Sequence, residues 1–96
     1  MYTQPADTAV FDAYYHGTHV PLAKTLPNLR EMNLSTAPPT ALMGTAPYFV
    51  AELVFDTMAE LQDALRSPEG QKTAADLANF AQAGVTILIL ETSRTM

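Results

Sequence analysis

The segment Val85–Glu91 constrains the fold most, because it is apolar on both of the faces that a strand presents. Val85, Ile87 and Ile89 fall on one face, and Leu88 and Leu90 fall on the other. Successive residues of a β-strand point to opposite sides of the sheet. The pattern therefore predicts a strand in a sheet that is covered on both sides.

Four strands and two helical regions are predicted in the order βαββαβ. Alternation is clearest at residues 48–55, whereas residues 28–35 alternate weakly and indicate an edge strand. Helices are predicted over residues 8–17 and over residues 57–81, the second in two pieces. This order is typical of an α+β fold with one antiparallel sheet and both helical regions on one face.

The helix starts carry capping residues. Their positions are Asp7 or Thr8 for the first helix, Thr57 with Glu60 for the second, and Ser67 before Pro68 for the third piece. Each supplies a side-chain oxygen to backbone N–H groups that have no partner inside the helix.

The second face of the sheet has no helix to cover it. Tyr48, Val50 and Val54 are predicted on that face together with one side of the last strand. Several hundred Å² of exposed apolar sheet are unusual in a soluble monomer. We therefore expect a homodimer in which two such faces pack together.

The composition of the chain restricts its partners. Its 96 residues are expected to form a single domain, 1–96, with 48% hydrophobic and only 16% charged residues. A formal charge of −5, with five Lys and Arg in all, argues against nucleic acid and against anionic membrane surfaces. Without cysteine, a signal peptide or a run of about 20 apolar residues, a cytoplasmic location is expected.

Residues 11–26 hold both histidines and two of the four tyrosines. Phe11, Tyr15 and His19 are four apart, so they fall on one stripe of a helix. Pro21 is expected to break this helix between Gly17 and Val20, because its ring clashes with the carbonyl four residues earlier. His19 is then expected at a helix end.

Three motifs in this order resemble those of the EthD-like family. They are Phe11-Asp12-x-Tyr14-Tyr15-x-x-x-His19-x-Pro21-Leu22, Ala51-Glu52-Leu53-x-Phe55-Asp56, and Ser67-Pro68-Glu69-Gly70-Gln71 followed by 75–80. The resemblance implies a ferredoxin-like subunit that dimerises into an α+β barrel. Relatives range from oxygenases and dehydratases to proteins with no assigned reaction, so it implies less about activity.

The N-terminus departs from the family pattern. Met1–Pro5 is similar only to the tail of the family's first strand, which is central in a ferredoxin-like sheet. Either the sequence begins late within that strand or the strand is short here. The first strand is therefore expected to be truncated.

Two residues are candidates for catalysis. His19 is the candidate general acid or base, because an unperturbed histidine titrates near pH 6.5; the alternative is a histidine that fastens a helix end. Glu52 is the candidate carboxylate, since it falls between Val50 and Val54 on the face assigned to the barrel interior. A structural role with an arginine or a tyrosine is its alternative.

Four aromatic residues are candidates for ligand binding: Phe11, Tyr14, Tyr15 and Tyr48. Tyrosine hydroxyls can orient a substrate, although aromatic residues at helical spacing more often belong to the core. Asp12, His16 and His19 have the composition of a facial metal triad, but Pro21 undermines the helix at the third ligand. No metal and no organic cofactor are therefore expected.

The expected function is the binding of a small, mostly apolar organic molecule in a pocket between the sheet and the first helix. The resemblance places it in oxidative metabolism, as a cofactor-independent oxidoreductase or monooxygenase, or as a dehydratase-like enzyme. The alternatives are a non-catalytic accessory or carrier for a separate oxygenase, and a purely structural dimer.

Overall fold

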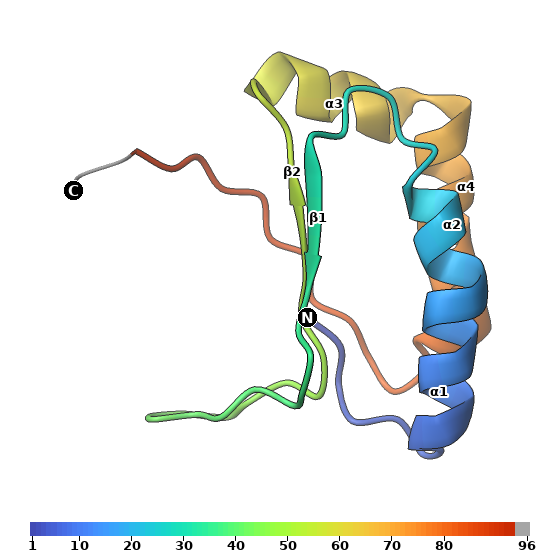
Figure 1. The fold of residues 1–96 in the computed structure, drawn as a ribbon, viewed down its shortest axis with the longest axis vertical. Coiled ribbons are helices and arrows are strands. Elements are labelled where there is room, and N and C mark those ends of the chain that lie inside the picture. The colour runs from blue at the N-terminus through green and yellow to red at the C-terminus, as the bar shows by residue number, and fades with distance from the viewer. Residues whose placement is uncertain (94–96) are drawn as a thin grey trace.

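The computed structural model describes residues 1–93 of the chain. Helices and strands form two layers, with the helices on one face of a small sheet (Figure 1). The elements are α1 (Thr8–Tyr14), the π-helical segment η1 (Tyr15–His19), α2 (Val20–Ala23), β1 (Glu31–Leu34), β2 (Ala51–Val54), α3 (Met58–Arg66) and α4 (Pro68–Phe80). The α+β class with helices on one face is thus confirmed.

The predicted helix starts are confirmed at all three positions. The side chain of Asp7 accepts a hydrogen bond from the Val10 N–H, and Thr57 accepts one from the Glu60 N–H. Ser67 ends α3 and begins α4, since its hydroxyl accepts from the Gly70 N–H. Each cap satisfies a donor that the first helical turn leaves free.

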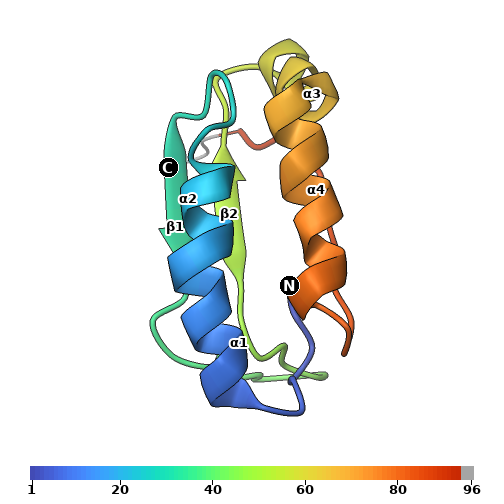
Figure 2. The same ribbon diagram turned by 90° about the vertical axis from the view of Figure 1, so that its right-hand side faces the viewer.

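The expected break before Pro21 is wrong, because the helix widens instead of ending. Residues 15–19 form a π-helical turn in which the Val20 N–H donates to the Tyr15 carbonyl, five residues earlier. In an ordinary α-helix the Pro21 ring would clash with the Gly17 carbonyl, and a π-helical turn at this point relieves that conflict. The first helical region therefore runs on through η1 into α2, and α4 lies beside it (Figure 2).

The sheet is built around β1 and β2, which pair antiparallel with Glu31 opposite Val54. Tyr2 extends the sheet by two isolated antiparallel bridges, one to Phe49 and one to Val85. The predicted first strand thus lies between the third and the fourth, as in a βαββαβ sheet, but it is reduced to one bridged residue.

The predicted strand Val85–Glu91 is wrong beyond its first residues. Met1 and Thr86 exchange two backbone hydrogen bonds of 2.8 Å, and the pairing between the first and the last segment ends there. In this register residues 87–93 pair with no strand of the described part of the chain. Residues 87–90 consequently leave the sheet, and their apolar side chains are 53–69% exposed.

The core lies between the two layers and is mainly aromatic. Its buried members are Tyr2, Phe11, Tyr15, Val20, Phe49 and Phe80. Burial raises the pKa of Tyr2 to about 12, so this phenol stays protonated at any physiological pH.

Candidate functional site

Asp76 collects three hydrogen bonds on the buried side of α4. Its Oδ1 accepts from the Tyr14 hydroxyl at 2.5 Å and from the Asn79 amide at 3.0 Å, while its Oδ2 lies 2.9 Å from His19 Nδ1. Only 8% of Asp76 and 4% of His19 are exposed. We call these four residues the Asp76 cluster.

The Asp76 cluster holds an ionised carboxylate. Burial by itself would raise the pKa of Asp76, but hydrogen bonds from Tyr14, Asn79 and His19 outweigh it and lower the pKa below the ordinary value of 3.8. The bond to Asp76 also raises the pKa of Tyr14, which remains the donor. A carboxylate only accepts, so His19 Nδ1 carries the proton in this bond.

The second ring nitrogen of His19 is left for other partners. Among the described residues, His19 makes its side-chain hydrogen bond only through Nδ1. Every fully buried side-chain nitrogen or oxygen of the described residues has a hydrogen-bond partner. Nε2 has none, so it is not fully buried and touches solvent. A ring with its proton on Nδ1 and a free Nε2 is the arrangement that a general base requires.

The π-helical turn is what brings Tyr14 and His19 to one acceptor. In an α-helix each residue turns by about 100°, so residues five apart point about 140° away from one another. A π turn closes between residues five apart and reduces that angle. Tyr14 and His19 therefore both reach Asp76.

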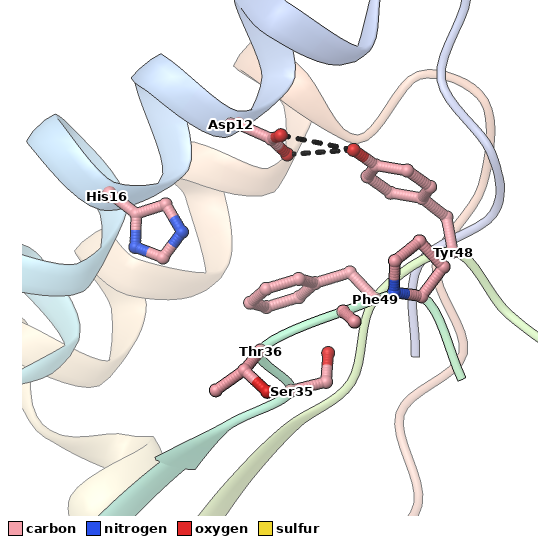
Figure 3. A pocket seen from close by; sticks show the side chains of 8 residues that line it. Asp12, His16, Ser35, Thr36, Tyr48 and Phe49 are labelled. Atoms are coloured by element: carbon pink, nitrogen blue, oxygen red, sulfur yellow. Dashed lines mark hydrogen bonds between the residues drawn. The ribbon is translucent and has the colours of Figure 1, made fainter.

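A separate pocket of about 100 Å³ lies between the first helical region and the segments that follow β1 and precede β2. It is lined by Asp12, His16, Ser35, Thr36, Ala37, Pro38, Tyr48 and Phe49. In Figure 3, Asp12 and His16 extend from the helical side toward Tyr48 and Phe49, with Ser35 and Thr36 beneath. For comparison, a closed cavity of about 150 Å³ in another protein holds benzene.

The Tyr48 hydroxyl faces both carboxylate oxygens of Asp12 at 3.1 Å (Figure 3). Burial and this contact raise the pKa of Tyr48, so the phenol is a donor. Both distances exceed the 2.5–2.7 Å typical of an O–H donor on a carboxylate. The pair is therefore looser than the bond between Tyr14 and Asp76.

The sequence-predicted site residues are divided among four places: the Asp76 cluster, the pocket, the core and the exposed surface of β2. Tyr14 and His19 meet in the Asp76 cluster. The predicted place of Tyr48 on the uncovered face of the sheet is wrong, because its ring packs against Phe11 and its hydroxyl faces Asp12, both on α1, where it lines the pocket. Phe11 and Tyr15 are core residues, 4% and 1% exposed. Their predicted roles in catalysis or ligand binding stay predictions.

Glu52 lies apart from both the cluster and the pocket. It is exposed in the single chain, and its carboxylate accepts a 2.9 Å hydrogen bond from Asn33 on the neighbouring strand. Its proposed role as an acid or base therefore stays a prediction, without a partner from the Asp76 cluster.

The structure does not bring Asp12, His16 and His19 together, since His19 turns toward Asp76 and His16 toward the pocket. Within residues 1–93, no group of three or more His, Asp or Glu side chains is placed to hold a metal ion. In the same part of the chain, no helix has the length and apolar character needed to cross a membrane.

A wider hollow of about 370 Å³ lies at the start of β1. It is lined by Lys24 and residues 29–32. Its guanidinium, from Arg30, is paired with Asp56 at 3.3 Å. We regard the smaller pocket as the better ligand site because it joins a polar pair to an aromatic ring, as ligand sites usually do.

Asp76 is the residue that reasoning from sequence missed. It lies four residues before Phe80 and three after Thr73, so it falls on the inward stripe of α4. An acid on an inward stripe needs a buried partner. That spacing was the available signal.

Comparisons with known proteins agree with this architecture. A sequence model of the EthD domain matches residues 3–84. The chain belongs to the EthD family. An uncharacterised 11.0 kDa protein from the thcB–thcC intergenic region of Rhodococcus erythropolis is 41% identical over 97 residues, which cover 95% of this chain and 88% of that protein.

A solved structure shows the same EthD fold. The crystal structure of an ethyl tert-butyl ether (EthD) family protein from Bacillus halodurans C-125 matches with a TM-score of 0.85 and 33% identity. The match covers 96% of this chain and 92% of that one. The expected EthD membership and fold are thus confirmed.

Proposed function

We propose that this EthD protein binds a small, mostly apolar organic molecule in the pocket between the first helical region and the strands. The observation that carries the proposal is the pairing of Tyr48 and Asp12 beside the buried ring of Phe49. An apolar wall with a few convergent polar groups is the usual composition of a ligand site.

The family supports oxidative metabolism as the context. Its name refers to ethyl tert-butyl ether, which is small and mostly apolar, and the Bacillus relative carries that name. The proposed chemistry is that of a cofactor-independent oxidoreductase or monooxygenase, or of a dehydratase. A carrier for a separate oxygenase and a purely structural dimer are the alternatives.

In the catalytic version of the proposal, His19 transfers the proton. Asp76 holds Nδ1–H, which leaves Nε2 as the acceptor. His19 does not line the pocket, however; Tyr15 packs against both His19 and the pocket residue Phe49, with ring centroids 5.3 Å and 4.6 Å away. Ligand binding is therefore the first conclusion and catalysis the second.

A second copy of the chain belongs to the proposal. Residues 87–90 expose four large apolar side chains in succession, and Val50 and Val54 are only half-buried. Exposed apolar surface of this kind marks an interface. The exposure of these side chains supports the proposed homodimer, in which a second copy packs against the free face of the sheet and against residues 87–90.

The experiment is a ligand screen by thermal shift, followed by titration of two matched variants. Tyr48→Phe removes the hydroxyl that faces the pocket, whereas Tyr14→Phe removes one from the Asp76 cluster. We expect Tyr48→Phe to weaken binding of any hydroxylated hit several-fold and Tyr14→Phe to leave it unchanged. Equal losses in both variants would contradict the assignment of the pocket.

A third variant, His19→Ala, distinguishes an enzyme from a carrier. Loss of turnover with unchanged ligand affinity identifies an enzyme. Unchanged turnover contradicts a catalytic role for His19, and ligand binding without any turnover in the unmodified protein identifies a carrier.

A further inference from the structure

The charge of the pocket lining restricts what can enter it. Its lining residues include one carboxylate, Asp12, one imidazole, His16, and neither lysine nor arginine. The whole chain carries a formal charge of −5. An anionic ligand would therefore meet a like charge inside the pocket and a net negative protein outside it.

The hydrogen-bonding groups of the pocket also favour a ligand that donates a hydrogen bond. One hydroxyl proton of Tyr48 is shared between two oxygens at 3.1 Å, so it cannot satisfy both. A carboxylate offers about four lone-pair positions. Asp12 therefore has acceptor capacity to spare, and it is exposed enough for a ligand to reach.

We propose that the pocket selects a neutral hydroxyl compound, an alcohol or a phenol, over a carboxylate of similar size, and that Asp12 makes the choice. This inference rests on the proposed function and names its ligand class. The ligand hydroxyl donates to Asp12 and accepts the Tyr48 proton, which turns from Asp12 to the ligand, while the apolar part of the ligand lies against Phe49. A carboxylate ligand has no proton to donate and is repelled by Asp12.

The size of the pocket fits the head of such a molecule. About 100 Å³ is less than the roughly 150 Å³ that encloses benzene, so part of a ring compound projects into solvent. A ligand that buries so little of its surface gains little against the translational and rotational freedom it loses, so we expect weak binding. NMR titration detects such binding and locates it by residue.

The experiment titrates the whole protein with phenol, toluene and benzoate at pH 8, where an ordinary histidine is neutral. Backbone amide shifts of Ser35, Tyr48 and Phe49 report occupancy of the pocket. We expect phenol to bind at least about fivefold more tightly than benzoate. That is the discrimination between like charges about 4 Å apart, even at the dielectric constant of water.

Two variants with the same change in charge isolate the residue responsible. Asp12→Asn should bring the phenol-to-benzoate ratio close to one, mostly by strengthening benzoate binding. Asp63→Asn makes the same change on α3, on an exposed residue outside the pocket, and should leave the ratio unchanged. The circular dichroism spectrum of each variant verifies its fold.

The outcomes separate the inference from the proposed function. If benzoate binds the unmodified protein as well as phenol does, or if Asp63→Asn changes the ratio as much as Asp12→Asn, the hydroxyl preference is overturned while the ligand pocket stands. If none of the three compounds shifts the pocket amides at millimolar concentration, the pocket assignment fails, and the inference fails with it.

Discussion

The Tyr14 hydroxyl donates a 2.5 Å hydrogen bond to Asp76 across 62 positions of the chain. Tyr14 ends α1 and Asp76 lies within α4, so the bond joins the two helical regions at their buried faces. His19, at the end of the π-helical turn, bonds the same carboxylate. Asp76 thus provides the main polar contact between the two helical regions.

The first prediction concerns the stability that Asp76 provides. Asp76→Asn removes the charge that three donors share, and its amide can no longer accept on both sides. Hydrogen bonds to charged groups contribute about 1.5–3 kcal/mol each, so we expect a loss of roughly 2–4 kcal/mol in the free energy of unfolding at neutral pH. Urea denaturation measures it.

Asp63→Asn is the matched control for this change. Asp63 is exposed and lies 4.0 Å from Arg66, so its loss should change stability by less than about 0.5 kcal/mol. A similar loss in both variants would show that net charge, and not the Asp76 cluster, accounts for the effect.

The second prediction is a dependence on acid pH. The folded state lowers the pKa of Asp76 below 3.8, so its contribution is complete above that value and is lost as the pH falls through the folded-state pKa. The difference in the free energy of unfolding between the unmodified protein and Asp76→Asn should therefore become smaller as the pH falls from 5 to 3. Denaturation curves at both pH values measure the difference. An advantage that widens toward pH 3 would contradict the lowered pKa.

The third prediction compares two glycines. A Cβ at Gly70 would overlap the carbonyl oxygen of Ala64 and lie 2.8 Å from that of Leu65, because α4 starts against the last turn of α3. Backbone atoms cannot move aside cheaply, so Gly70→Ala should cost at least about 2 kcal/mol. For a domain near this size, 1 kcal/mol corresponds to about 4–8 °C in Tm.

Gly17→Ala is the contrasting variant. Nothing lies within 4 Å of a Cβ at Gly17, which is in the helical region. Alanine there should stabilise the protein by about 0.5–1 kcal/mol, since glycine loses more backbone freedom on folding. In thermal melts, the Tm of Gly70→Ala should fall and the Tm of Gly17→Ala should rise. A lower Tm in both variants would mean that the π-helical turn requires Gly17.

The helix starts could be predicted because capping is local. Asp7, Thr57 and Ser67 each act on an N–H three residues away, so the sequence contains both partners side by side. The π-helical turn could not be predicted in this way. Pro21 signals a conflict with the Gly17 carbonyl, but packing of the helix against α4 decides whether the helix ends or widens.

The strand ends and the site depended on distant partners. Residues 87–90 have the pattern of a strand, yet pairing is set by the register between Met1 and Thr86, which leaves them without a neighbour. Asp76 and His19 are 57 positions apart, and Tyr48 and Asp12 are 36 apart. Local spacing identified His19 and Tyr48 as candidates, but it could not say which acid each would meet.

The last prediction concerns the exposed C-terminal segment. Ile87 and Ile89 are 69% and 53% exposed in the single chain, and two adjacent leucines are similarly exposed. Burying them against a second copy would contribute about 25 cal/mol per Å² of apolar surface, whereas lysines there would have to keep their charges in water. The double variant Ile87→Lys, Ile89→Lys should therefore be monomeric, whereas we expect the unmodified protein to be a dimer.

Sedimentation equilibrium at micromolar concentration measures this change. Val10→Lys is the control, because Val10 is 64% exposed but lies on α1, on the opposite side of the molecule from the free face of the sheet. It should leave the dimer intact. A monomeric unmodified protein would contradict the proposed pairing directly, and a double variant that stays dimeric would move the interface away from residues 87–90.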